Sequence, residues 1–144
     1  MSLPRNRTMP PAVVMPVLVY ADVDGAAEWL CQAFGFAQRW RAHGHRSQLV
    51  TSDGGAVVLA EGSTAGSCGA HSVMVRVANV DSHHARALEW NARILSAPAD
   101  YPYGERQYTV EDPGGHRWTF SQSIADVAPE DWGGDSGPGM SVDG

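Results

Sequence analysis

The stretch that decides the fold is residues 101–122, YPYGERQYTVEDPGGHRWTFSQ. Two runs of alternating side-chain character, 105–111 and 116–122, flank the sequence DPGG at 112–115. Proline fixes φ at the first position of a tight turn, and glycine supplies the positive φ that a reversal needs. The aromatic and β-branched residues on both sides suit a half-buried pleated surface. The stretch therefore predicts a β-hairpin.

The second strand of this hairpin has two chemically different faces, because successive side chains of a strand point to opposite sides. One face, which we expect to pack on a helix, carries His116, Trp118 and Phe120. The other face is small and polar and suits the lining of a cavity; it carries Arg117, Thr119 and Ser121.

The composition favours one domain that binds neither nucleic acid nor membrane. The chain has 144 residues and a formal net charge of −6 at pH 7, whereas nucleic-acid-binding surfaces are normally basic. No apolar run approaches the about 20 residues of a membrane span, and no signal-peptide pattern opens the sequence. Cys31 and Cys68 do not make a disulfide framework, so we expect a cytoplasmic protein.

The same order of elements occurs twice along the chain. The first set is a strand at 13–20, a helix at 25–34, two strands within 37–52 and a strand at 56–60. The second set is a strand at 72–77, a helix at 82–90, a short strand at 93–95 and the hairpin. The Val-Asp pair at each helix start recurs after 57 residues, from Val23 to Val80, and the Gly-Gly turn recurs after 60, from Asp53 to Pro113.

This repeat predicts an α+β fold of two tandem βαβββ modules, because neither half-sheet can bury both of its faces alone. The predicted boundaries are a flexible N-terminus at 1–12, module 1 at 13–61, a linker at 62–70, module 2 at 71–125 and a Gly/Asp/Pro-rich tail at 126–144. The side chains expected to face inward are Ala26, Trp29, Leu30 and Ala33 in the first helix and Ala85, Leu88 and Trp90 in the second.

These features resemble the vicinal oxygen chelate superfamily, which contains glyoxalase I, bleomycin-resistance proteins, fosfomycin-resistance enzymes and extradiol dioxygenases. The resemblance covers residues 13–123 and rests on the paired units, the helix entries ADVD (21–24) and VANVD (77–81), and the hairpin motif YGER…DPGGHRW. It is closest to the bacterial glyoxalase-like group, most of whose members have no assigned substrate. It implies a curved mixed sheet with a cleft, usually in a homodimer, and leaves the activity open because this fold serves several chemistries.

Metal-using members of the superfamily place ligands at four cleft-facing positions, on the first and last strand of each module. The repeat carries these positions over to Met15, Leu59, Ser72 and Thr119. None is a histidine or a carboxylate, and a thioether or an aliphatic group cannot replace those ligands for hard divalent ions. The resemblance therefore implies a cleft without a metal or another cofactor.

One alternative retains a divalent metal. His71 precedes Ser72, and Glu61 lies two residues beyond Leu59. A bulge at His71 would bring both side chains into the cleft. Two protein ligands are fewer than the three of a catalytic zinc site. The remaining histidines have simpler interpretations, because His83 and His84 fit a solvated helix face.

The predicted cleft has an apolar floor with a few convergent polar groups, which is typical of small-molecule pockets. Its predicted lining residues are Trp40, Met74, Arg76, Tyr101, Tyr103, Arg106, Tyr108, Arg117, Thr119 and Ser121. Ordinary ion pairs and core packing use the same residue types, so those structural roles stay open beside ligand binding.

Two classes of function fit this sequence. The first is a metal-free, sequestering homodimer that binds a small organic molecule, planar or aromatic, as in the bleomycin-resistance group. The second is a metal-dependent lyase, isomerase, transferase or dioxygenase with a non-standard ligand set. The sequence therefore leaves open whether the protein is an enzyme.

Overall fold

The structure is a computed structural model that describes residues 3–51, 53–63 and 70–141. It confirms the α+β fold and the duplication: two mixed four-stranded sheets repeat the same topology. Cys68 and most of the predicted linker lie outside the described ranges. In the part of the chain that is described, no helix is both long and apolar enough to cross a membrane.

Module 1 contains β1 (Val17–Tyr20), α1 (Val23–Phe34), β2 (Ala37–Ala42), β3 (Arg46–Val50) and β4 (Ala56–Glu61). The sheet order is β1-β4-β3-β2, with β1 parallel to β4 and the other neighbours antiparallel. The carboxylate of Asp22 caps α1 by accepting from the N–H of Gly25 at 3.0 Å. Gly35 ends the helix with φ of 77°, a conformation that glycine adopts without strain.

Module 2 contains β5 (Ser72–Arg76), α2 (Val80–Glu89), β6 (Arg93–Tyr101), β7 (Glu105–Glu111) and β8 (Arg117–Ser123). The sheet order β5-β8-β7-β6 repeats that of module 1. The β7–β8 hairpin forms as predicted. Strand β6 is longer than the predicted 93–95, because two irregularities in its pairing with β7 let it continue to Tyr101. Two short 3₁₀ helices, η1 (Pro129–Trp132) and η2 (Pro138–Ser141), follow in the tail.

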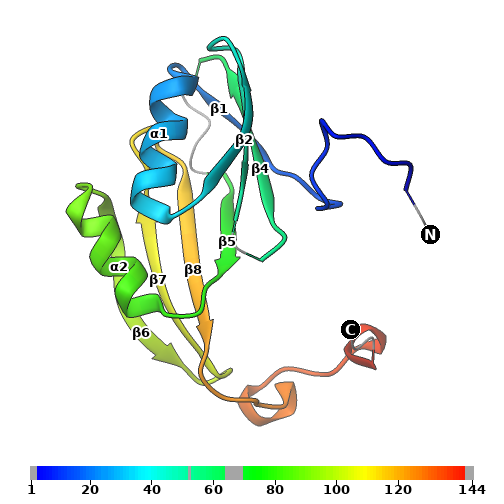
Figure 1. The fold of residues 1–144 in the computed structure, drawn as a ribbon. Helices are drawn as coiled ribbons and strands as arrows, with labels where there is room; N and C mark the ends of the chain where they lie inside the picture. Colours follow the sequence, from blue (N-terminus) through cyan, green and yellow to red (C-terminus); the bar gives the residue numbers. More distant parts are fainter. Residues whose placement is uncertain (1–2, 52, 64–69, 142–144) are drawn as a thin grey trace.

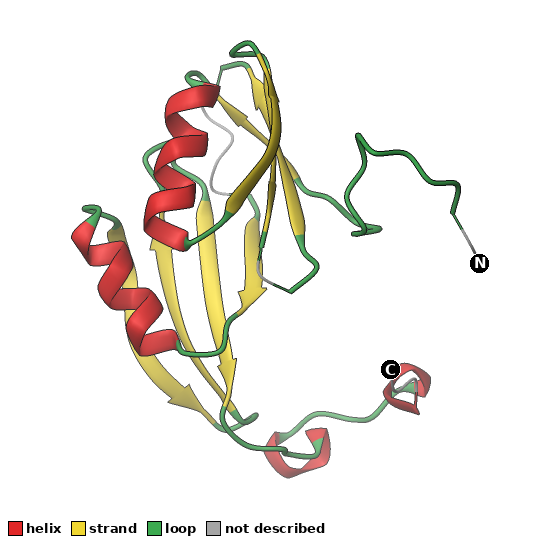
Figure 2. Cartoon of the chain, viewed as in Figure 1, coloured by secondary structure: helices red, strands yellow, loops and turns green. Residues whose placement is uncertain are grey.

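Both helices cover the same side of the two sheets, and the N-terminal segment lies on the other side (Figures 1 and 2). The core between helices and sheets is continuous from one module to the other. Phe34 at the end of α1 packs edge-on against Trp118 and Phe120 of β8, with ring centroids 5.5 and 4.8 Å apart. Aromatic pairs in this geometry add to the free energy gained by burial. The modules are therefore joined by a shared aromatic core.

The buried face of α2 differs from the prediction. Val80 and Ala87 are buried, whereas Ala85 is exposed and Leu88 and Trp90 are 50% and 42% exposed. The helix starts at Val80, and His83 completes the inward stripe one turn later. The backbone carbonyl of Trp90 accepts a hydrogen bond from Nε1 of Trp29 at 2.9 Å. The prediction was wrong because it took His83 as a solvated residue.

Candidate functional site

The groove face is the face of each sheet that points away from the helices. On sheet β5-β8-β7-β6, a network of polar side chains follows this face. Ser121 donates to Glu105 at 2.6 Å and accepts from Gln107 at 3.0 Å, and Arg76 donates to Ser123 at 2.8 Å. Burial acts to raise the pKa of Glu105, but hydrogen bonds from the two serines and the charge of Arg76 bring that pKa below its ordinary value. The network therefore holds a carboxylate in its charged form.

The groove face of module 1 requires a correction to the sequence repeat. Gly54 and Gly115, which have φ of 90° and 88°, are the equivalent turn glycines, so the last strand repeats after 61 residues rather than 60. Strand pairing agrees, because β1 pairs Val17 with Val58 and β5 pairs Met74 with Thr119. Leu59 is therefore in the core, fully buried beside Leu18, and Val58 takes its predicted place in the groove.

The corrected groove positions do not fit a divalent metal. They are Met15, Val58, Ser72 and Thr119, none of which supplies a carboxylate or an imidazole. Thr119 instead shares a hydrogen bond with Thr109 at 3.1 Å. Across the described ranges, no group of three or more histidine, cysteine, aspartate or glutamate residues is arranged to hold a metal ion.

The alternative ligand pair is not assembled either. Glu61 lies at the end of β4, where it pairs with His45 at 3.3 Å rather than with His71. The described pairing of β5 has no irregularity that would turn His71 toward the groove. The ring of His71 lies 5.5 Å from that of His116, whose Nδ1 is buried without a hydrogen-bond partner among the described residues. Two imidazoles without a third ligand fall short of a catalytic metal site.

Three of the predicted aromatic residues, Trp40, Tyr101 and Tyr103, lie in two different places. Trp40 donates from Nε1 to the carbonyl of Thr8 at 3.0 Å, so the N-terminal segment, predicted as flexible, contacts sheet β1-β4-β3-β2. Tyr101 and Tyr103 stack with ring centroids 5.4 Å apart, and Trp132 packs edge-on against Tyr103 at 5.5 Å. These aromatic side chains do not converge on one rim.

Two further predicted site residues make structural contacts on the helix side of their sheet. Arg106 pairs with Asp81 and Asp100, each at 3.0 Å. Tyr108 is buried and stacks on Phe120. These contacts on the helix side of the sheet do not support a role of Arg106 or Tyr108 in a ligand site on the groove face. Met74, Arg76, Arg117, Thr119 and Ser121 do share the groove face, as their alternation predicts.

His83 is a half-buried link between the modules rather than a solvated residue. Its Nδ1 accepts from the hydroxyl of Tyr108 at 2.5 Å, and its Nε2 donates to the carbonyl of Phe34 at 3.1 Å. The ring also lies 4.0 Å from that of Phe120. Burial lowers the pKa of His83 to about 4, against the opposing effect of the Phe34 carbonyl. The imidazole is therefore neutral at pH 7.

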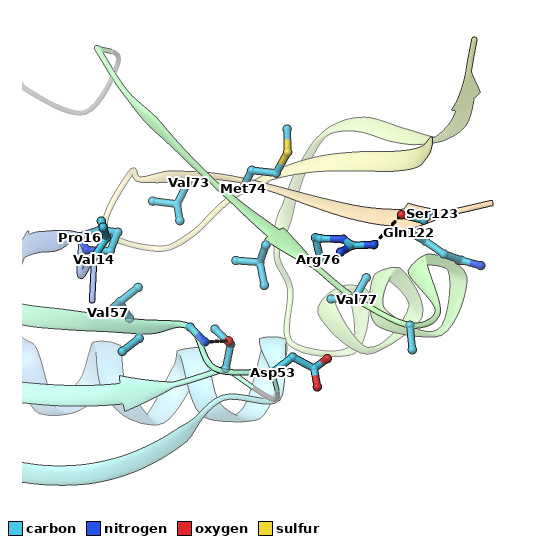
Figure 3. Close-up of a pocket in the computed structure, with 15 residues that line it drawn as sticks. Val14, Pro16, Asp53, Val57, Val73, Met74, Arg76, Val77, Gln122 and Ser123 are labelled. Atoms are coloured by element: carbon cyan, nitrogen blue, oxygen red, sulfur yellow. Dashed lines mark hydrogen bonds between the residues drawn. The ribbon is translucent and has the colours of Figure 1, made fainter. Parts of the chain in front are cut away.

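A cavity of about 680 Å³ lies where the two modules meet. Its walls come from the lead-in to β1, the β3–β4 turn, the start of β4, strand β5 and the end of β8 (Figure 3). Of the predicted site residues, Met74 and Arg76 line it. The lining residues that the sequence did not indicate include Thr51, Asp53, Gly55, Val57, Val73, Val75 and Val77.

At the equivalent junction on the other side of the molecule, buried side chains fill the centre, and a smaller cavity of about 430 Å³ lies between Tyr20, Asp112 and α1. We call this junction the filled junction; it consists of Tyr20, Asp112, His116 and Trp118, all less than 5% exposed. The Asp112 carboxylate accepts from the Tyr20 hydroxyl at 2.5 Å and from Nε1 of Trp118 at 2.9 Å. His116 donates from Nε2 to the carbonyl of Val19 at 2.8 Å. A buried side chain that makes a hydrogen bond therefore occupies each of these four positions.

The junction at the cavity has small residues at the same positions. We call it the open junction; it consists of Val77, Thr51, Gly55 and Val57, which correspond to Tyr20, Asp112, His116 and Trp118. The turns keep the same backbone, because Thr51 N–H bonds to the Gly55 carbonyl as Asp112 N–H bonds to that of His116, both at 2.9 Å. The open junction therefore carries smaller side chains on an equivalent backbone, beside the larger of the two cavities.

Comparison with known proteins agrees with this architecture. Residues 12–120 match the family model of the glyoxalase/bleomycin resistance protein/dioxygenase superfamily. The chain belongs to this superfamily.

Among similar solved structures, TioX from Micromonospora sp. ML1 is 31% identical with a TM-score of 0.66, over 81% of this chain and 100% of that chain. The fosfomycin resistance protein FosX from Listeria monocytogenes has a TM-score of 0.65 at 13% identity, over 79% and 94% of the two chains, and shows the fold alone. The uncharacterized protein Mb0911c of Mycobacterium bovis is 27% identical in a 127-residue alignment that covers 78% of this chain and 84% of that protein.

Proposed function

We propose that this protein is a metal-free, small-molecule-binding homodimer that sequesters its ligand, as the bleomycin-resistance proteins of its superfamily do. The observation that carries the proposal is the chemistry of the corrected groove positions. Met15, Val58, Ser72 and Thr119 offer hydroxyl, thioether and aliphatic groups where metal-using members carry ligands.

Two further observations support binding. The cavity of about 680 Å³ lies within the range of about 300–1,000 Å³ that small-molecule sites occupy. Large apolar side chains also remain exposed beside it: Val14 is 80% exposed, Val17 55% and Met74 62%. Exposed apolar side chains favour association, which supports a second copy of the chain as a partner.

The metal content of the purified protein tests the proposal. The protein is produced with manganese, iron, nickel and zinc supplied, purified without chelator, and analysed by mass spectrometry of its metals and by sedimentation. We expect far less than one ion per protomer and a dimer. One tightly held divalent ion per protomer would contradict the proposal and favour the metal-dependent enzyme.

A further inference from the structure

The open-junction cavity is lined by side chains from both faces of strand β5, and so it differs from the groove face. Strand β5 is an edge strand, so the cavity reaches side chains from both of its sides. Val73 and Met74 leave the strand in opposite directions, and Val73 points toward Val57 of module 1 (Figure 3). The groove-face valines Val17 and Val19 are not part of the cavity wall. A ligand in the cavity and a ligand on the groove face would therefore contact different valines.

The cavity wall is mostly apolar. Val57, Val73, Val75 and Val77 surround its inner part, and Val14 and Pro16 close one end. Branched aliphatic side chains form a smooth wall without hydrogen-bonding groups, which favours the face of a planar apolar molecule. The volume of about 680 Å³ leaves room for a ring system of three fused rings.

The polar groups of the cavity lie at one end and nearly balance in charge. Arg76 donates one hydrogen bond to Ser123, and no described carboxylate lies within salt-bridge distance of its guanidinium. Its remaining N–H groups are donors suited to an acceptor on a ligand. Asp53 lines the same cavity, and Glu105 acts on the charge of Arg76 from the groove face. An anionic ligand would meet Asp53 in the cavity and the charge of Glu105 on the groove face, and a cationic ligand would meet Arg76.

We propose that the open junction is the ligand site of this protein and takes an uncharged, planar aromatic molecule that carries a carbonyl group. The aromatic body lies among Val57, Val75 and Val77, and the carbonyl accepts from Arg76. A donor N–H or O–H on the ligand suits the carboxylate of Asp53. The proposal rests on the proposed function and adds the place and the chemical class of the ligand.

Methyl NMR of the valine-labelled dimer locates the site directly. The probe is 9-acridone, a neutral tricyclic molecule with one carbonyl and one N–H, compared with acridine-9-carboxylate, an anion of nearly the same shape. We expect saturable shifts at Val57, Val75 and Val77 with acridone, none at Val80 and Val110 in the core, and at least tenfold weaker binding of the carboxylate.

An arginine pair provides matched variants. Arg76→Gln should weaken acridone binding about fivefold, because a charged donor to the carbonyl is lost. Arg46→Gln removes an equal charge from the exposed start of β3, outside the cavity, and should leave the affinity unchanged. Unchanged methyl spectra of Val80 and Val110 show that both variants fold.

Three results would overturn the proposal: no saturable shift with either probe, shifts at Val17 and Val19 in place of the cavity valines, or tighter binding of the carboxylate. The second of these leaves the proposed function standing, because the ligand would then bind on the groove face. A stoichiometric metal ion would contradict the proposed function independently of either probe.

Discussion

The two junctions between the modules have equivalent backbones but differ in the size of their side chains, which are large at one junction and small at the other. At the filled junction, Tyr20 reaches Asp112 and His116 reaches the carbonyl of Val19. At the open junction, Val77 and Thr51 take the places of the first pair, and Gly55 that of His116. The duplicated fold therefore has two similar junctions: large buried side chains fill the centre of one and leave a cavity of about 430 Å³ beside it, whereas the other has small side chains and a cavity of about 680 Å³. The hydrogen bonds of the filled junction favour stability, and the open junction is the ligand site that we propose.

The substitution Asp112→Ala in the filled junction is expected to cause the largest loss in the free energy of unfolding. Besides Tyr20 and Trp118, the carboxylate accepts from the backbone N–H groups of Gly114 and His116, both at 3.0 Å. Removing it leaves buried donors unpaired, so unfolding in urea should require about 4 kcal/mol less free energy. Thr51→Ala at the equivalent position should cost less than about 1 kcal/mol. Equal losses would show that the junctions do not differ in this way.

The hydroxyl of Tyr20 allows a finer test of the filled junction. Tyr20→Phe keeps the buried ring and removes one donor to the Asp112 carboxylate, so we expect a loss of about 2 kcal/mol in the free energy of unfolding. Tyr101→Phe is the matched control, because its ring stacks on Tyr103 by its face. A loss as small as that of the control would mean that the hydrogen bond contributes little.

The contact between the modules should also depend on pH through His83. Its pKa is about 4 in the fold, below the ordinary value of 6.5. The neutral ring therefore contributes its full stability above pH 6.5, and this contribution is lost as the pH falls toward 4. Between pH 7.5 and 4.5 we expect a loss of about 2 kcal/mol, allowing for the partial solvent access of the ring.

Urea unfolding at the two pH values measures this loss. The variant His83→Leu should lack this part of the pH dependence, and His84→Leu should keep it. The same acid sensitivity in wild type and His83→Leu would assign the effect to other groups.

The smallest change in the free energy of unfolding is expected when residues of the filled junction are introduced at the open junction. The double variant Thr51→Asp, Val77→Tyr places the Tyr20–Asp112 pair at equivalent positions. Filling a cavity typically stabilises a fold, so the free energy of unfolding should rise by about 1 kcal/mol. The two single variants serve as controls, because each introduces a polar group without its partner. A double variant no more stable than the singles would indicate that the junctions are not equivalent.

The hairpin and the repeat could be predicted from the sequence because local rules determine them. DPGG specifies its turn, and Asp22 and Asn79 are ordinary helix caps. The register of β4 could not be predicted in the same way. The glycine pairs at 54–55 and 114–115 suggest one alignment, whereas the backbone φ and the strand pairing show that Gly54 corresponds to Gly115. An error of one residue places Leu59 on the wrong face of the sheet.

The cavity was missed for a related reason. Small residues such as Val77 and Gly55 carry no chemical signal of their own. Only an alignment of the two modules in the correct register pairs Val77 with Tyr20 and Gly55 with His116. That comparison shows that the side chains at the open junction are smaller. His83 was mispredicted in the other direction. Its position in the sequence is typical of a solvated residue, but its imidazole packs against Phe34 and Phe120.

The most direct test of the open junction as a ligand site is a fluorescence titration of 9-acridone with wild-type protein and with the double variant Thr51→Asp, Val77→Tyr. Saturable binding to the wild type and at least tenfold weaker binding to the variant are expected, with the thermal stability of the variant retained or raised. Equal affinity for the two proteins would contradict the assignment of the ligand to this cavity.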